Sequence, residues 1–182
     1  MELVKQSADL PERFEDVART AGATVERVAR DLTAIAAAVE RISQPAARIA
    51  VADSHDLPTE LLEGCRNLPG AFPGRSKSEL AAADIGVTEA FAGVAASGSL
   101  CVAVDDGSSG YISLLARTHV AIVAADSLVE RVSDLFQRGE SPRGIALARN
   151  FVFVTGPSAT ADMGPLVRGV HGPHRLHILV LE

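Results

Sequence analysis

Residues 156–162 (GPSATAD) follow a run of apolar residues, and their types suit the binding of an anion. Gly156 lets the backbone leave a strand sharply, and Ser158 or Thr160 can cap a following helix. The exposed amide groups of this turn, together with the two hydroxyls, would then form a small anion pocket. A helix that is simply well capped needs the same residues, so both interpretations stay open.

A second candidate site flanks the apolar run at 100–104 (LCVAV). Ser97, Gly98 and Ser99 precede this run, and residues 105–110 (DDGSSG) follow it. Carboxylates and hydroxyls in a glycine-rich loop could orient a hydroxylated ligand or a hydrated cation. A solvated turn favours the same residue types, so these residues alone decide nothing.

Three histidines recur at intervals of three, at His171, His174 and His177. Imidazole is a common metal ligand, but Pro173 disfavours a continuous helix through the segment, and extended backbone would put His171 and His174 on opposite faces. We therefore predict no metal site. His171 alone remains a candidate loop-borne general acid, general base or hydrogen-bond donor, with a structural loop histidine as the alternative.

Strand-like and helix-like segments alternate along the whole chain, which predicts one three-layer α/β/α domain over residues 1–182 with a mainly parallel sheet. Asp31 is the predicted cap of the second helix. We predict helices over 11–21, 32–42, 57–63, 89–95 and 128–136. We predict strands over 24–28, 48–52, 84–88, 100–104, 120–124, 151–155 and 177–181.

Open parallel sheets bind ligands beyond the carboxyl ends of their strands, so we expect the candidate residues at that end. The continuous apolar runs 120–124 and 151–155 are typical of strands that are covered on both faces. Residues 64–78 contain several Gly and Pro residues and predict a long loop or flap.

Composition excludes several classes of protein. The 182 residues are 47% hydrophobic, and the net charge of -6 comes without a basic tract, which argues against disorder and against a nucleic-acid partner. No apolar run is long enough for a signal peptide or a membrane span, so we expect a cytoplasmic protein. Cys65 and Cys101 are too few for a disulfide framework or a sulfur-ligated metal, and no dinucleotide, phosphate-loop, serine-hydrolase or zinc-protease motif is present. We predict no cofactor.

Four segments in this order resemble the lactate-utilisation (LUD) domain of the LutC/YkgG-like family: ADIGVTEAFAGVAASGSL, SLLARTHVAIV, TGPSATADM and LVRGVHGPHRLHILVLE. The resemblance runs from about Asp84 to the C-terminus. It implies the α/β/α fold shared by glucosamine-6-phosphate deaminases, ribose-5-phosphate isomerases and CoA transferases (the NagB/RpiA/CoA-transferase-like fold). It also implies a role in oxidising L-lactate to pyruvate beside iron–sulfur partner proteins.

The family pattern maps onto both candidate segments of the C-terminal half. The candidate catalytic residues are His171 and Asp162, and the candidate ligand-binding residues are Ser97, Gly98, Ser99, Gly156, Ser158, Thr160, Ala161 and Gly172. Family members usually have an acidic residue, an Arg and a Glu at the positions of Ala96, Ala159 and Gly164 here. These departures remove a candidate general base and an anion clamp, so a catalytic site would be weakened or altered in this chain.

Three functions are compatible with these observations. The first is an accessory protein of organic-acid oxidation that acts with iron–sulfur subunits and binds lactate, pyruvate or another small anion. The second is a stand-alone enzyme for a phosphorylated sugar or a CoA thioester, which rests on fold analogy. The third is an interaction module that docks partners through the segment 64–78. The oligomeric state stays open, a homo-oligomer included.

Overall fold

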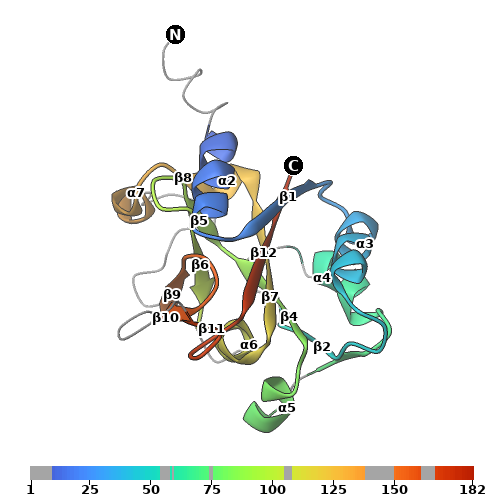
Figure 1. Ribbon diagram of the computed structural model, residues 1–182. Coiled ribbons are helices and arrows are strands. Elements are labelled where there is room, and N and C mark those ends of the chain that lie inside the picture. The colour runs from blue at the N-terminus through green and yellow to red at the C-terminus, as the bar shows by residue number, and fades with distance from the viewer. Residues whose placement is uncertain are drawn as a thin grey trace.

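The computed structural model describes residues 10–53, 58, 60–73, 76–104, 108–137, 150–160 and 167–182. Its centre is a six-stranded sheet whose registered strand pairs are all parallel (Figure 1). In spatial order the strands are β1 (Thr24–Val28), β12 (Arg175–Leu181), β7 (Thr118–Ala124), β4 (Ile85–Ala90), β2 (Ile49–Val51) and β3 (Ala71–Phe72). All six therefore begin at one end of the sheet, called here the amino-terminal end, and finish at the opposite, carboxyl end.

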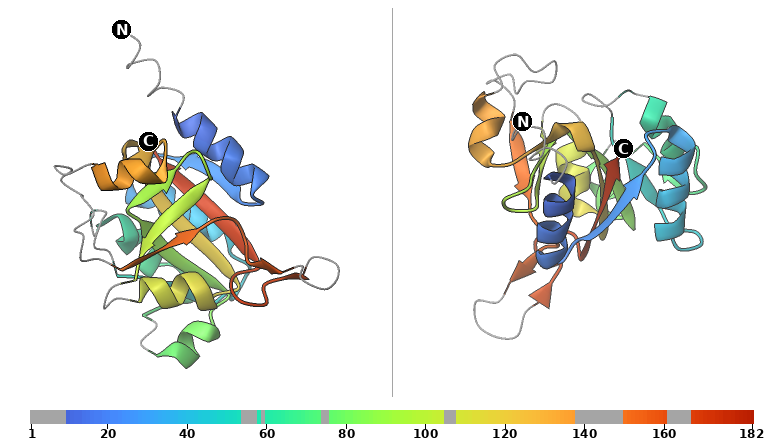
Figure 2. Two further views of the ribbon diagram at one scale, coloured as in Figure 1. Left: turned by 90° about the vertical axis from the view of Figure 1, so that its left-hand side faces the viewer. Right: turned by 90° about the horizontal axis from the view of Figure 1, so that it is seen from above.

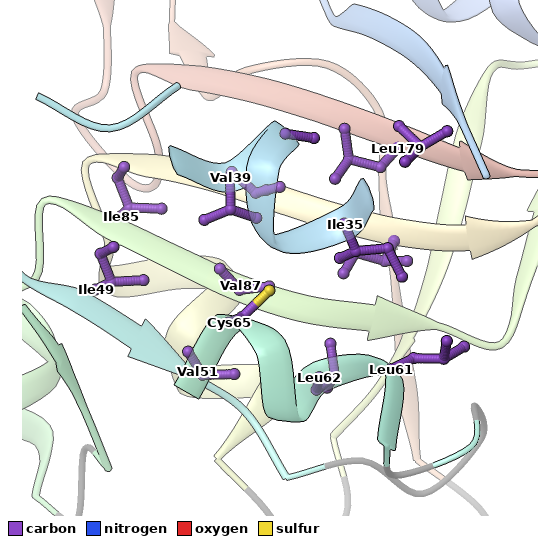
Figure 3. Close-up of a cluster of buried hydrophobic side chains, with 14 of the residues drawn as sticks. Ile35, Val39, Ile49, Val51, Leu61, Leu62, Cys65, Ile85, Val87 and Leu179 are labelled. Atoms are coloured by element: carbon purple, nitrogen blue, oxygen red, sulfur yellow. The ribbon is translucent and has the colours of Figure 1, made fainter. Parts of the chain in front are cut away.

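One face of this sheet is covered by α3 (Leu32–Ile42) and α4 (Glu60–Arg66). The carboxylate of Asp31 accepts hydrogen bonds from the backbone N–H groups of Thr33 and Ala34, so α3 begins where the sequence predicts. Figure 3 shows the core beneath the two helices, in which apolar side chains from both helices meet side chains from the strands. Its labelled members are Ile35, Val39, Ile49, Val51, Leu61, Leu62, Cys65, Ile85, Val87 and Leu179.

The opposite face is covered by helices and by a second, smaller sheet (Figure 2). The helices are α2 (Leu10–Thr20), α5 (Lys77–Ala81) and α6 (Ser109–Leu115). The second sheet has the order β8 (Leu128–Val129), β5 (Ala92–Val94), β6 (Ser99–Ala103) and β9 (Phe151–Val154). Phe14 and Ala18 of α2 are fully buried between the two sheets. The remaining elements are η1 (Ala125–Ser127), α7 (Val132–Gln137), β10 (Ala159–Thr160) and β11 (Val167–Arg168).

The fold class is confirmed, because helices flank a mainly parallel central sheet. The predicted helix over 89–95 is wrong: β4 continues to Ala90 and β5 follows at once. This stretch is buried on both sides, and a Cβ at Gly93 would lie 2.6 Å from Leu128 Cδ2 and 3.0 Å from Phe14 Cε2. Such close packing between strands overrides the local helical preference of its alanines.

Three further expectations are corrected. Residues 64–78 are not one loop, since they contain the end of α4, strand β3 and the start of α5, where Ser76 and Glu79 form a reciprocal capping box. The predicted helix over 128–136 is a short strand followed by α7. Strand β9 is not covered on both faces, because Val152 and Phe153 are 40% and 44% exposed. The sequence patterns above predict no helix where α6 forms.

No helix in the described ranges combines the length and the apolar character needed to cross a bilayer.

Candidate functional site

The two glycine-containing motifs of the C-terminal half come together in space. Gly156 has a φ of +69°, and a Cβ there would lie 2.1 Å from the carbonyl oxygen of Ala21 at the end of α2. The ring of Pro157 packs against Gly22 in the same turn. The segment 156–157 therefore lies directly on the end of α2, and its glycine is required by a close approach to backbone.

Ser158 joins this turn to the segment before β12. Its amide donates a 2.9 Å hydrogen bond to the carbonyl of Pro173, and its carbonyl accepts a 2.9 Å hydrogen bond from the amide of Gly169. A Cβ at Gly172 would lie only 3.1 Å from Ser158 Cβ. We call residues 156–158 and 169–173 the clasp.

A helix that starts directly after Ser158 is not formed, whereas the residues that would follow a cap at Thr160 lie outside the described residues. Ala159 and Thr160 form β10, which pairs with β11 in antiparallel register. The amide of Ser158 is bound to Pro173, so it is not a free donor for an anion. Ligand roles for Gly156, Ser158, Thr160 and Gly172 stay predictions, and Ala161, Asp162 and Gly164 lie outside the described residues.

The clasp lies at the amino-terminal end of the parallel sheet, not at the carboxyl end where the sequence places it. The amide of His174 donates to the carbonyl of Arg117, and these residues stand immediately before β12 and β7. Figure 1 shows β10 and β11 at the lower end of the molecule, where β12 begins. The expectation fails because β9 is a strand of the second sheet, where it pairs with β6, and is not a strand of the parallel sheet.

The serines of the second candidate site bind one another. Ser99 is 4% exposed, and its Oγ lies 2.7 Å from Ser97 Oγ and 2.6 Å from Thr155 Oγ1. A Cβ at Gly98 would lie 2.5 Å from the amide nitrogen of Ala18 on α2. These contacts account for the residue types by packing, whereas a ligand role stays a prediction. Residues 105–107 lie outside the described ranges.

The three histidines have different surroundings. His171 and His174 are exposed, whereas His177 is half-buried in β12. Burial and then the positive charge of Arg175 lower the pKa of His177, and the charge of Glu26 raises it. Within the described residues, no group of three or more His, Cys, Asp or Glu side chains is arranged to hold a metal ion.

A cavity of about 610 Å³ opens beside the clasp, at the amino-terminal end of the parallel sheet. One wall comes from the end of α3 and the loop that follows it, and it is mainly apolar, with Ile42, Pro45, Ala46 and Ala47 beside the uncharged polar residue Gln44. The other wall is polar and carries Asp84, Arg117, Arg168, His174 and Arg175. We call this cavity the arginine pocket.

The arginines of this pocket differ from most others in the described part of the chain. No ion pair among the described residues involves Arg117, Arg168 or Arg175. A carboxylate does pair with each of six other arginines, namely Arg13, Arg19, Arg27, Arg30, Arg41 and Arg66. Asp84 is the only carboxylate that the described residues contribute to the pocket lining, and it accepts a 3.0 Å hydrogen bond from the amide of Arg48. The pocket is therefore a local positive region in a chain of net charge -6.

Residues 2–181 match the LUD domain family model. The chain belongs to the LUD domain family. Curated relatives called Lactate utilization protein C are similar to it, at 36% identity over 103 residues in Halalkalibacterium halodurans, 31% over 103 residues in Oceanobacillus iheyensis and 34% over 119 residues in Exiguobacterium sp.. These matches cover 55%, 55% and 60% of the chain, but only 45%, 44% and 49% of the relatives. The chain thus spans less than half the length of these relatives.

The crystal structure of a DUF162 family protein from Deinococcus radiodurans matches this LUD domain with a TM-score of 0.68. The match covers 97% of the chain and 98% of the crystallised protein at 20% sequence identity, so it shows a common fold.

The three arginines of the arginine pocket are not among the site residues that the sequence predicts. They are scattered at positions 117, 168 and 175 and form no motif. A usable signal is nevertheless present. Arg117 stands directly before one buried strand, and Arg175 begins another. Since neighbouring parallel strands begin at the same end of a sheet, cationic residues at strand starts converge there.

Proposed function

We propose that this chain is an accessory protein of L-lactate oxidation to pyruvate, which binds a small organic anion and acts with iron–sulfur partner proteins. The observation that carries the proposal is the LUD domain match over residues 2–181, together with relatives called Lactate utilization protein C. The arginine pocket supports the anion-binding part, because guanidinium groups bind carboxylates in bidentate geometry.

The cysteines support the assignment of electron transfer to partners. Oxidation of lactate to pyruvate removes two electrons and two protons, and an iron–sulfur cluster is commonly held by four thiolates. The chain has two cysteines, and they lie in separate core clusters. Burial raises the pKa of the Cys65 thiol to about 11 and that of the Cys101 thiol to about 12, so neither is available as a thiolate near neutral pH.

The test uses the full chain in its own host. A tagged chain is purified without oxygen from cells grown on L-lactate, and the co-purified proteins are analysed for iron, acid-labile sulfide and L-lactate oxidation with an artificial electron acceptor. We expect iron–sulfur proteins in the complex and lactate oxidation that depends on them. Lactate turnover by the isolated chain would contradict the accessory role, and so would normal growth on L-lactate after deletion of its gene.

A further inference from the structure

We infer that the arginine pocket binds a doubly charged organic anion with an apolar body, in preference to a three-carbon monocarboxylate such as lactate. The inference rests on the proposed binding of a small anion and specifies its chemical class. It follows from the charge of the pocket, from the composition of its two walls and from its size.

Charge gives the first constraint. The guanidinium groups of Arg117, Arg168 and Arg175 stay protonated at any physiological pH, and Asp84 is the only carboxylate among the described residues of the lining. The described residues therefore leave an excess of two positive charges at the pocket. A monocarboxylate neutralises half of this excess, whereas a phosphate monoester or a dicarboxylate neutralises it fully.

The positions of the arginines give the second constraint. Arg175 lies opposite Thr118 in the parallel register of β12 and β7, so Arg117 and Arg175 stand at the starts of neighbouring strands. The two residues are one position out of register, and both line the same cavity, where two guanidinium groups can bind one phosphate or two linked carboxylates. Arg168 reaches the same pocket from β11.

The opposite wall determines where the rest of the ligand lies. Ile42 is the last residue of α3, so the negative end of the helix dipole lies on the apolar side of the pocket. An anionic group is disfavoured at that wall and favoured at the arginines. The apolar side chains of Ile42, Pro45 and Ala47 then leave an uncharged surface for the body of the ligand.

Size favours a ligand larger than lactate. A cavity of about 610 Å³ falls within the range of roughly 300–1,000 Å³ that is typical of sites for drug-sized ligands. A three-carbon acid would leave most of this volume filled with water. It would also leave the apolar wall without a partner.

The experiment uses titration calorimetry on the full chain at pH 8 and low salt, with probes that vary charge and body separately. Phenyl phosphate and phthalate carry two charges on an aromatic body, benzoate carries one charge on the same body, and inorganic phosphate and L-lactate lack that body. We expect phenyl phosphate or phthalate to bind at least ten-fold tighter than the other three probes. The tighter of the two identifies a phosphate ester or a dicarboxylate as the ligand class.

Variants test the location. The double variant Arg117→Gln/Arg175→Gln should weaken binding of the better dianion by about 20-fold, because each exposed charge pair contributes up to about five-fold. Arg131→Gln removes the same charge from an exposed residue at the start of α7 and should leave affinity unchanged. Thermal unfolding of each variant verifies that it is folded.

Equal affinity for benzoate and the dianions, or full affinity in the double variant, would overturn the inference. Either result, with iron–sulfur partners still co-purified, would remove the dianion pocket and leave the accessory role in place. Tight dianion binding without such partners would remove the accessory role alone.

Discussion

His119 makes the stability of the fold depend on pH below neutrality. Its side chain is fully buried, its Nε2 atom lies 2.8 Å from Thr88 Oγ1, and its Nδ1 atom has no hydrogen-bond partner among the described residues. Burial lowers the pKa of His119 from 6.5 to about 4, because the imidazolium cannot be solvated there. The folded protein therefore keeps a neutral imidazole over a pH range in which the unfolded chain binds a proton.

The sign and size of the effect follow from this difference in pKa. Above pH 6.5 neither state binds the proton, and the free energy of unfolding does not depend on His119. Between pH 6.5 and about 4 only the unfolded chain is protonated, so stability falls with falling pH by about 3 kcal/mol in total. Below pH 4 the folded state is protonated too, and the contribution of His119 becomes constant.

The pH dependence of stability is measured by urea unfolding at pH values from 7.5 to 4, with circular dichroism as the probe of unfolding. Carboxylates titrate over part of this range, so the informative quantity is the difference between wild type and His119→Gln, which keeps a polar partner for Thr88 and cannot be protonated. On acidification, we expect the free energy of unfolding of the variant to fall by about 3 kcal/mol less than that of wild type. His171→Gln, at an exposed position, serves as the substitution control. Parallel stability curves for wild type and His119→Gln would refute the reasoning.

Two further predictions concern contacts of α2. Gly98→Ala should destabilise the protein by about 2–3 kcal/mol, because φ is +62° and the added methyl group would lie 2.5 Å from the Ala18 amide nitrogen; an unchanged melting temperature would contradict this close approach. Glu15→Gln should cost about 1–2 kcal/mol in urea unfolding, since the Glu15 side chain is 8% exposed and accepts from Arg27. Asp16→Asn is the matched control on the same helix. The Asp16 carboxylate is 83% exposed, so we expect its loss to lower the free energy of unfolding by less than about 0.5 kcal/mol. Equal losses of stability in the two variants would count against the buried ion pair.

Local patterns predict the first part of the fold well. Helices α2 and α3 and strand β1 begin and end within about a residue of their predicted bounds, because each has a clear apolar periodicity and α3 has an Asp cap. The second sheet is different, because it depends on pairings that are distant in sequence, such as Leu100 with Val154. Local sequence carries no information on that partner, and the local pattern over 89–95 predicts a helix where β5 forms.

Strand direction explains the misplaced candidate site. A run such as FVFV predicts a strand but not its orientation, and an alternating α/β pattern favours a parallel assignment. Because β9 belongs to the second sheet, its direction is not tied to that of the six parallel strands, and the turn after it lies at their amino-terminal end. Both family motifs lie in the clasp, where Ser158 packs close to Gly172, but the clasp is at the opposite end of the sheet from the one expected.

The clasp has a positioning role that does not require its residues to touch a ligand. Ser158 binds both ends of the loop 169–173, with its carbonyl at Gly169 and its amide at Pro173. Arg168 directly precedes this loop, and Arg175 follows it by two residues. Two backbone hydrogen bonds of one serine therefore fix the segments that bring both arginines to the pocket. Residues 159–168 separate the two motifs in sequence, but the motifs are needed together because Ser158 of the first holds the loop that the second forms.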